Sequence, residues 1–332
     1  MKRRWLLLGL SCVVLLVPAW LLTIARLVEP AGRTWVRLVA FTPYAVVLYL
    51  VAVVVLVVAS LRTRGFWRGL VRALAVVALL GLLLHAGWAS GPFLGGSAQA
   101  ATTGRPLTVM TSNLRLGRAD TARLVDLAVR RHVDLLVLQE VTPDALAGLE
   151  RAGVGDTFPH RAGRPAPGPA GTMVFARSRL GDVHRLATPL GSYRLVVRLP
   201  RSRGGRLRLV AVHPRPPIGD VAGWRADQLT VREAARESTG PTIVAGDLNA
   251  TTDHSSLREL VGRGYADAAT QARSGWQPTW PSAGVVRHLG FGVPPLVAID
   301  HVLVRDHLRA VRTEVVSLDG TDHRTLVATV LR

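Results

Sequence analysis

Polar side chains that can bind a metal ion or transfer a proton follow the ends of apolar segments in the C-terminal two thirds of the chain. In chain order they are Asn113, Gln139, Glu140, His213, Asp247, Asn249, Asp300, Asp322 and His323. Carboxylate oxygens are hard ligands that suit Mg²⁺, which is usually held by one or two carboxylates and keeps several waters. A histidine with a carboxylate partner can transfer a proton near neutral pH. Together these residue types could carry out metal-assisted hydrolysis.

Two of these residues stand in informative local patterns. Glu140 ends an apolar segment, where an unpaired charge is costly to bury, so it is the first choice of metal ligand. In the segment GDLN, alternation of side chains along a strand predicts Asp247 and Asn249 on one face. Asp247 could orient or deprotonate a water, and Asn249 could bind a phosphate oxygen. The alternatives are that Glu140 caps the helix that Pro143 starts, and that Asp247 and Asn249 form an Asx turn.

The elements that must position these residues are short strands alternating with amphipathic helices. Strands are expected at 107–113, 134–140, 172–177, 194–199, 206–213, 242–249, 299–304 and 326–331, and helices at 119–131 and 224–236. The first of these helices would present Leu124, Leu127 and Ala128 on one face. This pattern predicts an α/β domain with its site along strand ends.

The ordered set of polar residues resembles the endonuclease/exonuclease/phosphatase superfamily, which includes pancreatic-type deoxyribonucleases, bacterial sphingomyelinases and inositol-polyphosphate phosphatases. The resemblance covers residues 105–332, and GDLN and the Thr-Asp-His at 321–323 are its most specific pieces. It implies an α/β fold, a four-layer sandwich with two packed mixed sheets. It also implies a phosphoesterase that hydrolyses phosphodiester or phosphomonoester bonds by metal-assisted attack of water, with Mg²⁺ or Mn²⁺ as cofactor.

The resemblance further implies a role for each residue. The implied metal ligands are Asn113, Glu140 and Asp322, and the implied catalytic residues are His213, Asp247, Asn249, Asp300 and His323. Asp300 would orient His323, which would contact phosphate or act as a general acid or base. His213 matches a second catalytic histidine of the deoxyribonuclease and sphingomyelinase branches, although no acidic partner for it is evident. The family often has Ser-Arg after a strand, and the order A-R-S-R here leaves open whether Arg177 or Arg179 faces the site.

Three apolar segments precede this domain, at about residues 5–25, 38–61 and 70–90, and the uncharged part of the third begins after Arg72. Each is long enough to cross the roughly 30 Å hydrocarbon layer as a helix. The sequence therefore predicts a membrane anchor with three transmembrane helices at 1–92, a linker at 93–104 and a catalytic domain at 105–332.

The charges that flank these segments predict their orientation. Seven basic residues precede the first segment or lie around the second loop, whereas the first loop has three; the seven are Lys2, Arg3, Arg4, Arg62, Arg64, Arg68 and Arg72, and the three are Arg26, Arg33 and Arg37. Because Lys and Arg are retained in the cytoplasm, the N-terminus is expected inside and the catalytic domain outside the cell membrane. The alternatives are a cleaved signal peptide at the first segment and processing at Ala98-Gln99-Ala100.

Composition supports a membrane segment but does not select a substrate. The chain is 49% hydrophobic, with a mean hydropathy of +0.28. A formal charge of +19 favours polyanions, although a basic content that is almost entirely Arg could equally reflect a GC-rich genome. Cys12 is the only cysteine, which excludes an internal disulfide and a thiolate metal cluster.

Two other functional hypotheses compete with an enzyme. One is a catalytically silent binding or sensor module that retains the fold. The other is a transporter, which is disfavoured because the three apolar segments hold no acidic residue and only His85 as an ionisable group. The expected partner is a phosphate ester outside the cell, in extracellular nucleic acid, a lipid headgroup or an envelope polymer, and no obligate protein partner is evident. The loops that would select it, at 161–171 and 276–292, match no specific pattern.

Overall fold

The structure is a computed structural model that describes residues 2–95, 106–200, 205–282, 284, 287–288 and 291–332. The chain consists of two compact units, Met1–Gly91 and Pro92–Arg332. Most of the expected linker, including the candidate cleavage site Ala98-Gln99-Ala100, lies outside the described residues. Only its start is described, within the short helix α5 (Gly91–Leu94).

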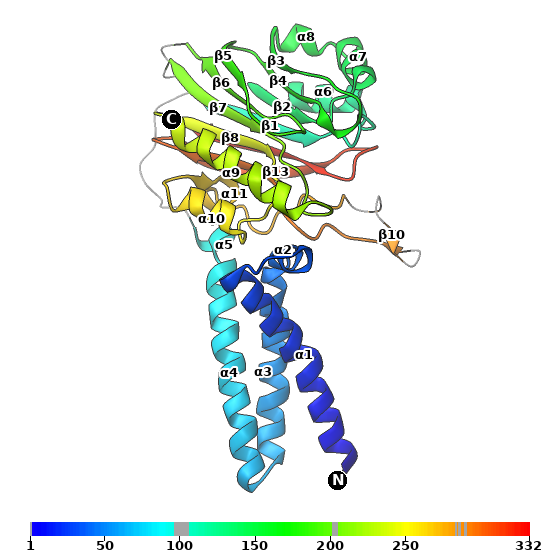
Figure 1. Cartoon of the computed structure of the whole chain (residues 1–332), viewed down its shortest axis with the longest axis vertical. Helices are drawn as coiled ribbons and strands as arrows, with labels where there is room; N and C mark the ends of the chain where they lie inside the picture. The colour runs from blue at the N-terminus through cyan, green and yellow to red at the C-terminus, as the bar shows by residue number, and fades with distance from the viewer. Residues whose placement is uncertain (1, 96–105, 201–204, 283, 285–286, 289–290) are drawn as a thin grey trace. The chain divides into compact units, whose positions relative to one another are not determined.

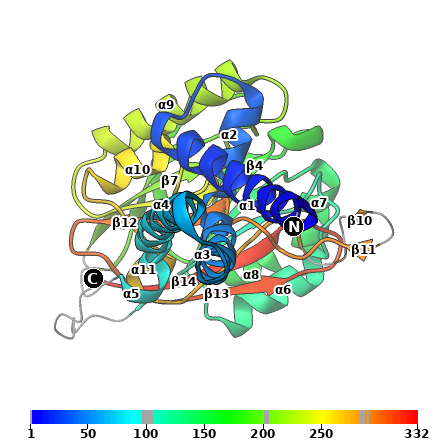
Figure 2. The same ribbon diagram turned by 90° about the horizontal axis from the view of Figure 1, so that it is seen from below.

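The first unit is a helical bundle. Its elements are α1 (Lys2–Val28), α2 (Arg33–Val39), the 3-10 turn η1 (Thr42–Tyr44), α3 (Ala45–Arg62) and α4 (Gly65–Ala89). Helix α3 packs against both α1 and α4 (Figures 1 and 2). The ring of Tyr49 occupies the space that a side chain at Gly81 would need. Thr23 hydrogen-bonds to the Tyr49 hydroxyl at 2.8 Å and to His85 Nε2 at 2.9 Å, so the polar groups of this bundle pair with one another.

Two helices in the described residues, Thr42–Arg62 and Gly65–Ala89, are long and apolar enough to cross a membrane. A third span is counted if Val14–Val28 and Arg33–Val39, which are bent by 98° relative to each other, are taken as one. Two or three membrane-crossing helices therefore precede the second unit, by length and composition.

The second unit contains two six-stranded mixed sheets. The first has the order β13-β14-β1-β2-β4-β3 and the second β5-β6-β7-β8-β12-β9. The strands of the first are β13 (Arg309–Ser317), β14 (Arg324–Leu331), β1 (Leu107–Asn113), β2 (Leu135–Gln139), β4 (Thr172–Ala176) and β3 (His160–Arg164). Those of the second are β5 (Arg179–Arg185), β6 (Tyr193–Arg198), β7 (Arg206–Val212), β8 (Thr242–Asp247), β12 (Asp300–Arg305) and β9 (Ala266–Asp267). A separate two-stranded sheet pairs β10 (Arg287–His288) with β11 (Phe291–Gly292).

Each large sheet has a single parallel pair among its described strands, and a helix crosses over between its members. β1 and β2 are parallel and are joined through α6 (Thr121–Arg130), whereas β7 and β8 are parallel and are joined through α9 (Val221–Glu237). Asp120 and Asp220 begin these helices by accepting hydrogen bonds from the backbone N–H groups of Arg123 and Gly223. Both parallel pairs bring the carboxyl ends of two strands to one edge of their sheet.

The two sheets pack face to face, and helices cover part of their outer faces. One core lies between the sheets and includes Val109, Val137, Leu209 and Ile243. A second core lies between the first sheet and the helices α6 and α7 (Pro143–Arg151), while α9 packs on β7 and α10 (Ser255–Val261) on α9 (Figure 1). The remaining short helices are α8 (Val154–Thr157), the 3-10 turn η2 (Gly168–Ala170) and α11 (Ala268–Gln271). This layering confirms the predicted α/β fold of two packed mixed sheets.

Candidate active site

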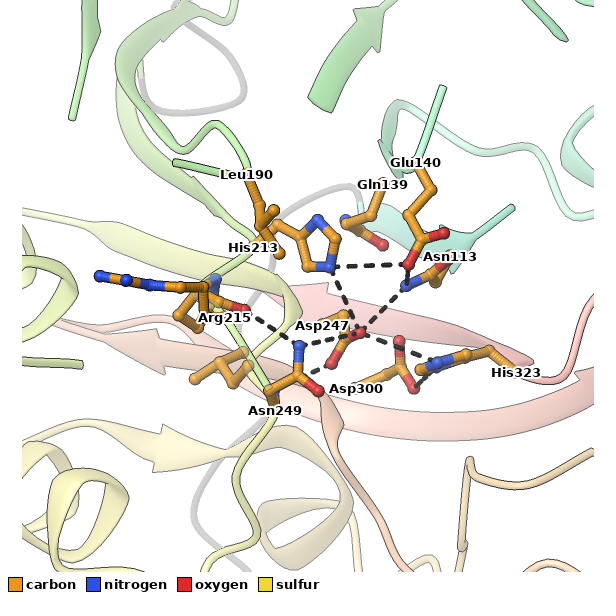
Figure 3. Close-up of polar contacts among 12 residues, drawn as sticks. Asn113, Gln139, Glu140, Leu190, His213, Arg215, Asp247, Asn249, Asp300 and His323 are labelled. Atoms are coloured by element: carbon orange, nitrogen blue, oxygen red, sulfur yellow. Dashed lines mark hydrogen bonds and ion pairs between the residues drawn. The ribbon is translucent and has the colours of Figure 1, made fainter. Parts of the chain in front are cut away.

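The polar residues singled out in the sequence come together where the two parallel pairs end (Figure 3). In the first sheet Asn113 ends β1 and Glu140 follows β2. In the second sheet His213 follows β7 and Asp247 ends β8. Asp300 begins β12 directly opposite Asp247 in an antiparallel register, and His323 precedes β14. Seven of the eight candidates therefore lie in one network that joins the two sheets.

Asp247 lies at the centre of this network and is buried. Its Oδ1 accepts a hydrogen bond from the backbone N–H of Asn249 at 2.9 Å, and its Oδ2 accepts one from Asn113 Nδ2 at 3.0 Å. Burial raises the pKa of Asp247, an effect that the nearby imidazoles of His323 and His213 oppose. A carboxylate with a raised pKa is a stronger base, which suits it to accept a proton from water.

The position before Asp247 requires a glycine, and Gly246 occupies it. Its φ is +149°, and a Cβ built on it would overlap the carbonyl oxygen of Val212 on the neighbouring strand. The close approach of β7 and β8 at this point therefore requires a residue without a side chain.

Asn249 does not share a strand face with Asp247, contrary to the prediction. Strand β8 ends at Asp247, and Asn249 has a left-handed φ of 47°. Its backbone N–H closes an Asx turn on Asp247, and its Nδ2 donates to the carbonyl of Pro214 at 3.0 Å. The turn that was the alternative interpretation is thus the means by which Asn249 enters the network.

His323 and Asp300 form a buried hydrogen-bonded pair. His323 Nδ1 and Asp300 Oδ2 are 2.9 Å apart, and His323 Nε2 lies 3.8 Å from Asp247 Oδ2. Burial disfavours the charged imidazole, but the attraction of Asp300 and Asp247 outweighs it and raises the pKa of His323 to about 10. His323 is therefore a cation near neutral pH, able to bind an anionic oxygen or to give up a proton.

Among the described residues, His213 has no acidic partner outside the network. The carboxylates within 4.0 Å of its Nε2 belong to the site itself: Asp247 Oδ2 at 3.7 Å and Glu140 Oε1 at 4.0 Å. Its backbone N–H donates to Ser192 Oγ at 3.0 Å, and its buried Nδ1 has no hydrogen-bond partner among the described residues. Burial lowers the pKa of His213, so its ring differs from His323 in being neutral near pH 7.

Glu140 adopts a left-handed φ of 57° that turns its carboxylate into the network. Oε1 accepts a hydrogen bond from Asn113 Nδ2 at 3.0 Å and Oε2 accepts one from the backbone N–H of Leu116 at 2.6 Å. Glu140 does not cap the following helix, because Thr142 does so by accepting a hydrogen bond from Ala145 N. Asn113 Nδ2 thus donates to the carboxylates of both Glu140 and Asp247. Asn113 Oδ1 accepts a hydrogen bond from the backbone N–H of Arg115 at 2.9 Å.

The side chains of Asp322 and Arg177 contact residues outside this network, although the charge of Asp322 also helps to raise the pKa of His323. Asp322 Oδ2 accepts a hydrogen bond from Trp280 Nε1 at 3.4 Å, and its Oδ1 is 3.8 Å from Arg115 Nε. Arg177 donates to the carbonyl of Val133 at 2.7 Å, at the start of β2 and thus at the opposite end from Glu140. Arg179 begins β5, where it is paired with Arg198, so neither arginine of the A-R-S-R segment faces the site.

Two hydroxyl side chains that the sequence analysis did not name as site residues hydrogen-bond to the backbone of residues in the network. Thr279 Oγ1 accepts hydrogen bonds from the backbone N–H groups of Ile299 and Asp300, at 3.1 Å each. Thr321 Oγ1 donates to the Asn113 carbonyl at 2.7 Å. The only signal in the sequence is the position of Thr321 within the Thr-Asp-His motif.

The charge balance of the site fits a divalent cation. Among the described residues, His213 and His323 are the only basic groups within 4.0 Å of the carboxylates of Glu140, Asp247 and Asp300. Asp247, Asp300 and His323 each offer one ligand atom, and these atoms lie within 4.8 Å of one another. A set rich in carboxylate oxygens suits Mg²⁺ or Mn²⁺ better than a softer metal.

The sequence and the fold of the second unit are both similar to those of known proteins. The sequence profile described as "Endonuclease/Exonuclease/phosphatase family" matches residues 110–323. The fold is similar to that of an endonuclease/exonuclease/phosphatase from Beutenbergia cavernae DSM 12333, with 21% identity, coverage of 68% of this chain and 72% of that one, and a TM-score of 0.54. It is also similar to D. rerio TDP2 complexed with single strand DNA product, with 18% identity, coverage of 68% and 99%, and a TM-score of 0.53. Among curated proteins, none matches the sequence significantly.

Proposed function

The chain belongs to the endonuclease/exonuclease/phosphatase family, whose members are usually hydrolases of phosphate esters, and we propose that it is a membrane-anchored, divalent-metal-dependent phosphoesterase. It would cleave phosphodiester or phosphomonoester bonds by attack of water. The observation that carries this proposal is the buried network in which a carboxylate of raised pKa, Asp247, lies between two histidines of opposite protonation state.

In this proposal Asp247 orients the attacking water and accepts its proton. Three hydrogen bonds hold the carboxylate of Asp247. The side-chain amides of Asn113 and Asn249 both donate to Oδ2, and the backbone N–H of Asn249 donates to Oδ1. The cationic His323, fixed by Asp300, binds a phosphoryl oxygen or protonates the leaving oxygen. The neutral His213 presents Nε2 to the same space and supplies a further hydrogen bond.

Glu140 is the residue proposed to hold the metal, with Asn113 beside it. When bound, the ion would neutralise charge on the phosphoryl oxygens. The cluster of Asp247, Asp300 and His323 is a less suitable place, because a histidine must be neutral to bind a metal and the pKa of His323 is raised to about 10. Asp322 was predicted as a further ligand, and its side chain is directed at Arg115 and Trp280 instead.

A test of the activity needs the full chain, purified in detergent, and simple chromogenic mono- and diesters such as p-nitrophenyl phosphate and bis(p-nitrophenyl) phosphate. We expect hydrolysis with Mg²⁺ or Mn²⁺ that stops on chelation, and that the Asp247→Asn variant lacks. Panels of nucleic acid, phospholipid and sugar phosphate would then define the substrate. If the wild-type chain shows no chelator-sensitive hydrolysis above the variant, the alternative of a catalytically silent binding module is correct.

The membrane location is proposed from the apolar helices and their flanking charges. The basic groups before α1 and between α3 and α4 would hold these ends in the cytoplasm, and three crossings would place the second unit outside. The available phosphate esters would then be lipid headgroups, envelope polymers and extracellular nucleic acid. Added protease should digest the second unit in intact spheroplasts. Protection until the membrane is permeabilised would contradict this topology and restore cytoplasmic substrates.

A further inference from the structure

Three arginines stand side by side across the second sheet, at the end of the strands far from the catalytic network. Arg198 on β6 is paired with Arg179 on β5 and with Arg206 on β7. Their neighbours Val197 and Leu207 belong to the core between the sheets, so the arginines point to the outer face, where all three are exposed. Like charges directly opposite each other destabilise a sheet. Within 4.0 Å of these three guanidinium groups there is no carboxylate of a described residue.

A cavity of about 640 Å³ adjoins this row. Basic side chains in its lining are His184, Arg194, Arg206, Arg208 and Arg332, and acidic ones are Asp182 and Glu237. Glu237 already accepts a hydrogen bond from Arg194 at 2.7 Å, and Arg208 donates to the carbonyl of Thr239 at 2.6 Å. The lining therefore keeps an excess of positive charge, and its guanidinium groups are partly fixed by neighbouring residues.

The cavity is separate from the catalytic network. Arg206 is the first residue of β7 and His213 directly follows its last. At roughly 3.3 Å per residue, the two lie about 23 Å apart along the strand. The lining residue of β6 nearest to the network, Arg194, is paired with Val210, which is about 10 Å from His213 along β7. A ligand in the cavity would thus leave Asp247 and His323 accessible.

We propose that this basic cavity, together with the row of Arg179, Arg198 and Arg206, is a second anion-binding site that takes a ligand carrying more than one phosphate group. Neighbouring strands are about 4.8 Å apart, so the row extends for about 10 Å, which is wide enough to pair with several phosphates at once. Arginine matches phosphate oxygens through two parallel N–H donors. The phosphates can come from a soluble polyphosphate or from adjacent anionic lipid headgroups, and both share this chemistry.

The experiment is a titration of the detergent-purified full chain with inorganic tripolyphosphate, with chelator present to prevent turnover. The test variant is Arg198→Ala/Arg206→Ala. The matched control is Arg151→Ala/Arg263→Ala, which removes the same charge from two exposed arginines outside the sheet. Losing two charge-assisted contacts should weaken binding at least tenfold in the test variant and change it little in the control. His323→Ala, which alters the catalytic network, should keep the affinity of the wild type.

The source of the phosphates is decided in a second arm. The same proteins are reconstituted in nanodiscs of phosphatidylcholine with or without phosphatidylglycerol, and their Tm values are compared. If phosphatidylglycerol raises the Tm of the wild type but not that of the test variant, the phosphates belong to lipid headgroups. If the wild type and the test variant differ only in their affinity for tripolyphosphate, the ligand is soluble. If the test variant behaves as its control in both arms, or if His323→Ala alone abolishes tripolyphosphate binding, the second site does not exist.

Discussion

The two ends of strand β7 carry opposite arrangements of charge. At its carboxyl end, His213 lies within 4.0 Å of two carboxylates, inside a buried network of hydrogen bonds and ion pairs. At its amino end, Arg206 faces Arg198 across the sheet, and both are exposed with no carboxylate of a described residue nearby. Enclosed charges alter one another's pKa strongly, whereas exposed charges are screened by water and salt. The first end is thus suited to chemistry and the second to binding.

The largest effect on turnover should follow from substitutions in the catalytic network at the carboxyl end of the strands. Asp247→Asn and His323→Ala are each expected to lower turnover by at least about 10²-fold, the usual scale for a general acid or base. Steady-state kinetics on the chromogenic esters would measure this. Tm values close to that of the wild type would show that the fold is intact. Loss of activity together with unfolding would mean that these residues are structural.

A smaller effect, which metal should reverse, is expected at Glu140. Glu140→Ala should weaken metal binding. Substitution of a residue that only supports a metal ligand already lowers affinity or activity by about tenfold or more, so the loss at a ligand should be at least as large. Activity at limiting Mg²⁺ should therefore fall, and raising Mg²⁺ or Mn²⁺ should partly restore it. A variant with the metal dependence of the wild type would show that Glu140 is not a ligand.

The pH dependence of stability would sharpen the contrast between enclosed and exposed charges. The pKa of His323 is raised in the fold from 6.5 to about 10. Its contribution to stability is therefore fully present below about pH 6.5 and is lost as the pH rises through about 10.

His323→Gln removes this contribution and keeps Asp247. The stability advantage of the wild type over the variant should shrink by at least about 1 kcal/mol between pH 7 and 10, or roughly 2–4 °C in Tm. Tm values across this range, measured with chelator, would test it. A constant difference would show that His323 is neutral in the fold.

The smallest effect on turnover is expected at the far end of the strands. Arg177→Ala removes a hydrogen bond to the Val133 carbonyl, and Arg206→Ala removes an exposed charge. Neither side chain reaches the catalytic network, so turnover of small esters should stay within about twofold, as for most surface substitutions. A larger fall would mean that the two ends of the sheet are coupled.

The central strands were predictable because both of their faces are covered. β1, β2, β4, β7, β8 and β12 read as nearly continuous apolar segments, and the expected strands coincide with them to within two residues at either end. The edge strands β3 and β5 and the long strand β13 were not predicted. Their side chains are largely exposed or half-buried, so HRAGR and RLGDVHR show no apolar alternation. Pairing with a neighbouring strand, rather than local sequence, makes them strands.

Residue type and chain order were enough to choose Asn113, Glu140, His213, Asp247 and His323, because a polar group that ends a buried strand needs a reason to be there. The same order suggested Asp322 and left Arg177 and Arg179 as alternatives, and the fold directs these side chains elsewhere. A motif indicates that a residue is near the site, but the direction of its side chain depends on the backbone. The positive φ of Glu140 is an example, since glutamate has no preference for this conformation and the packed strands hold it there.

The sequence was sufficient for the family, for the α/β class and for the presence of apolar helices long enough to cross a membrane, because these depend on composition, on periodicity and on a few short motifs. The packed structure alone decided which groups touch. It shifted the pKa values of His213 and His323 in opposite directions, because these values depend on burial and on carboxylates from distant segments. It also aligned Arg179, Arg198 and Arg206, since strand register is fixed by pairing over the whole sheet and cannot be read from any one strand.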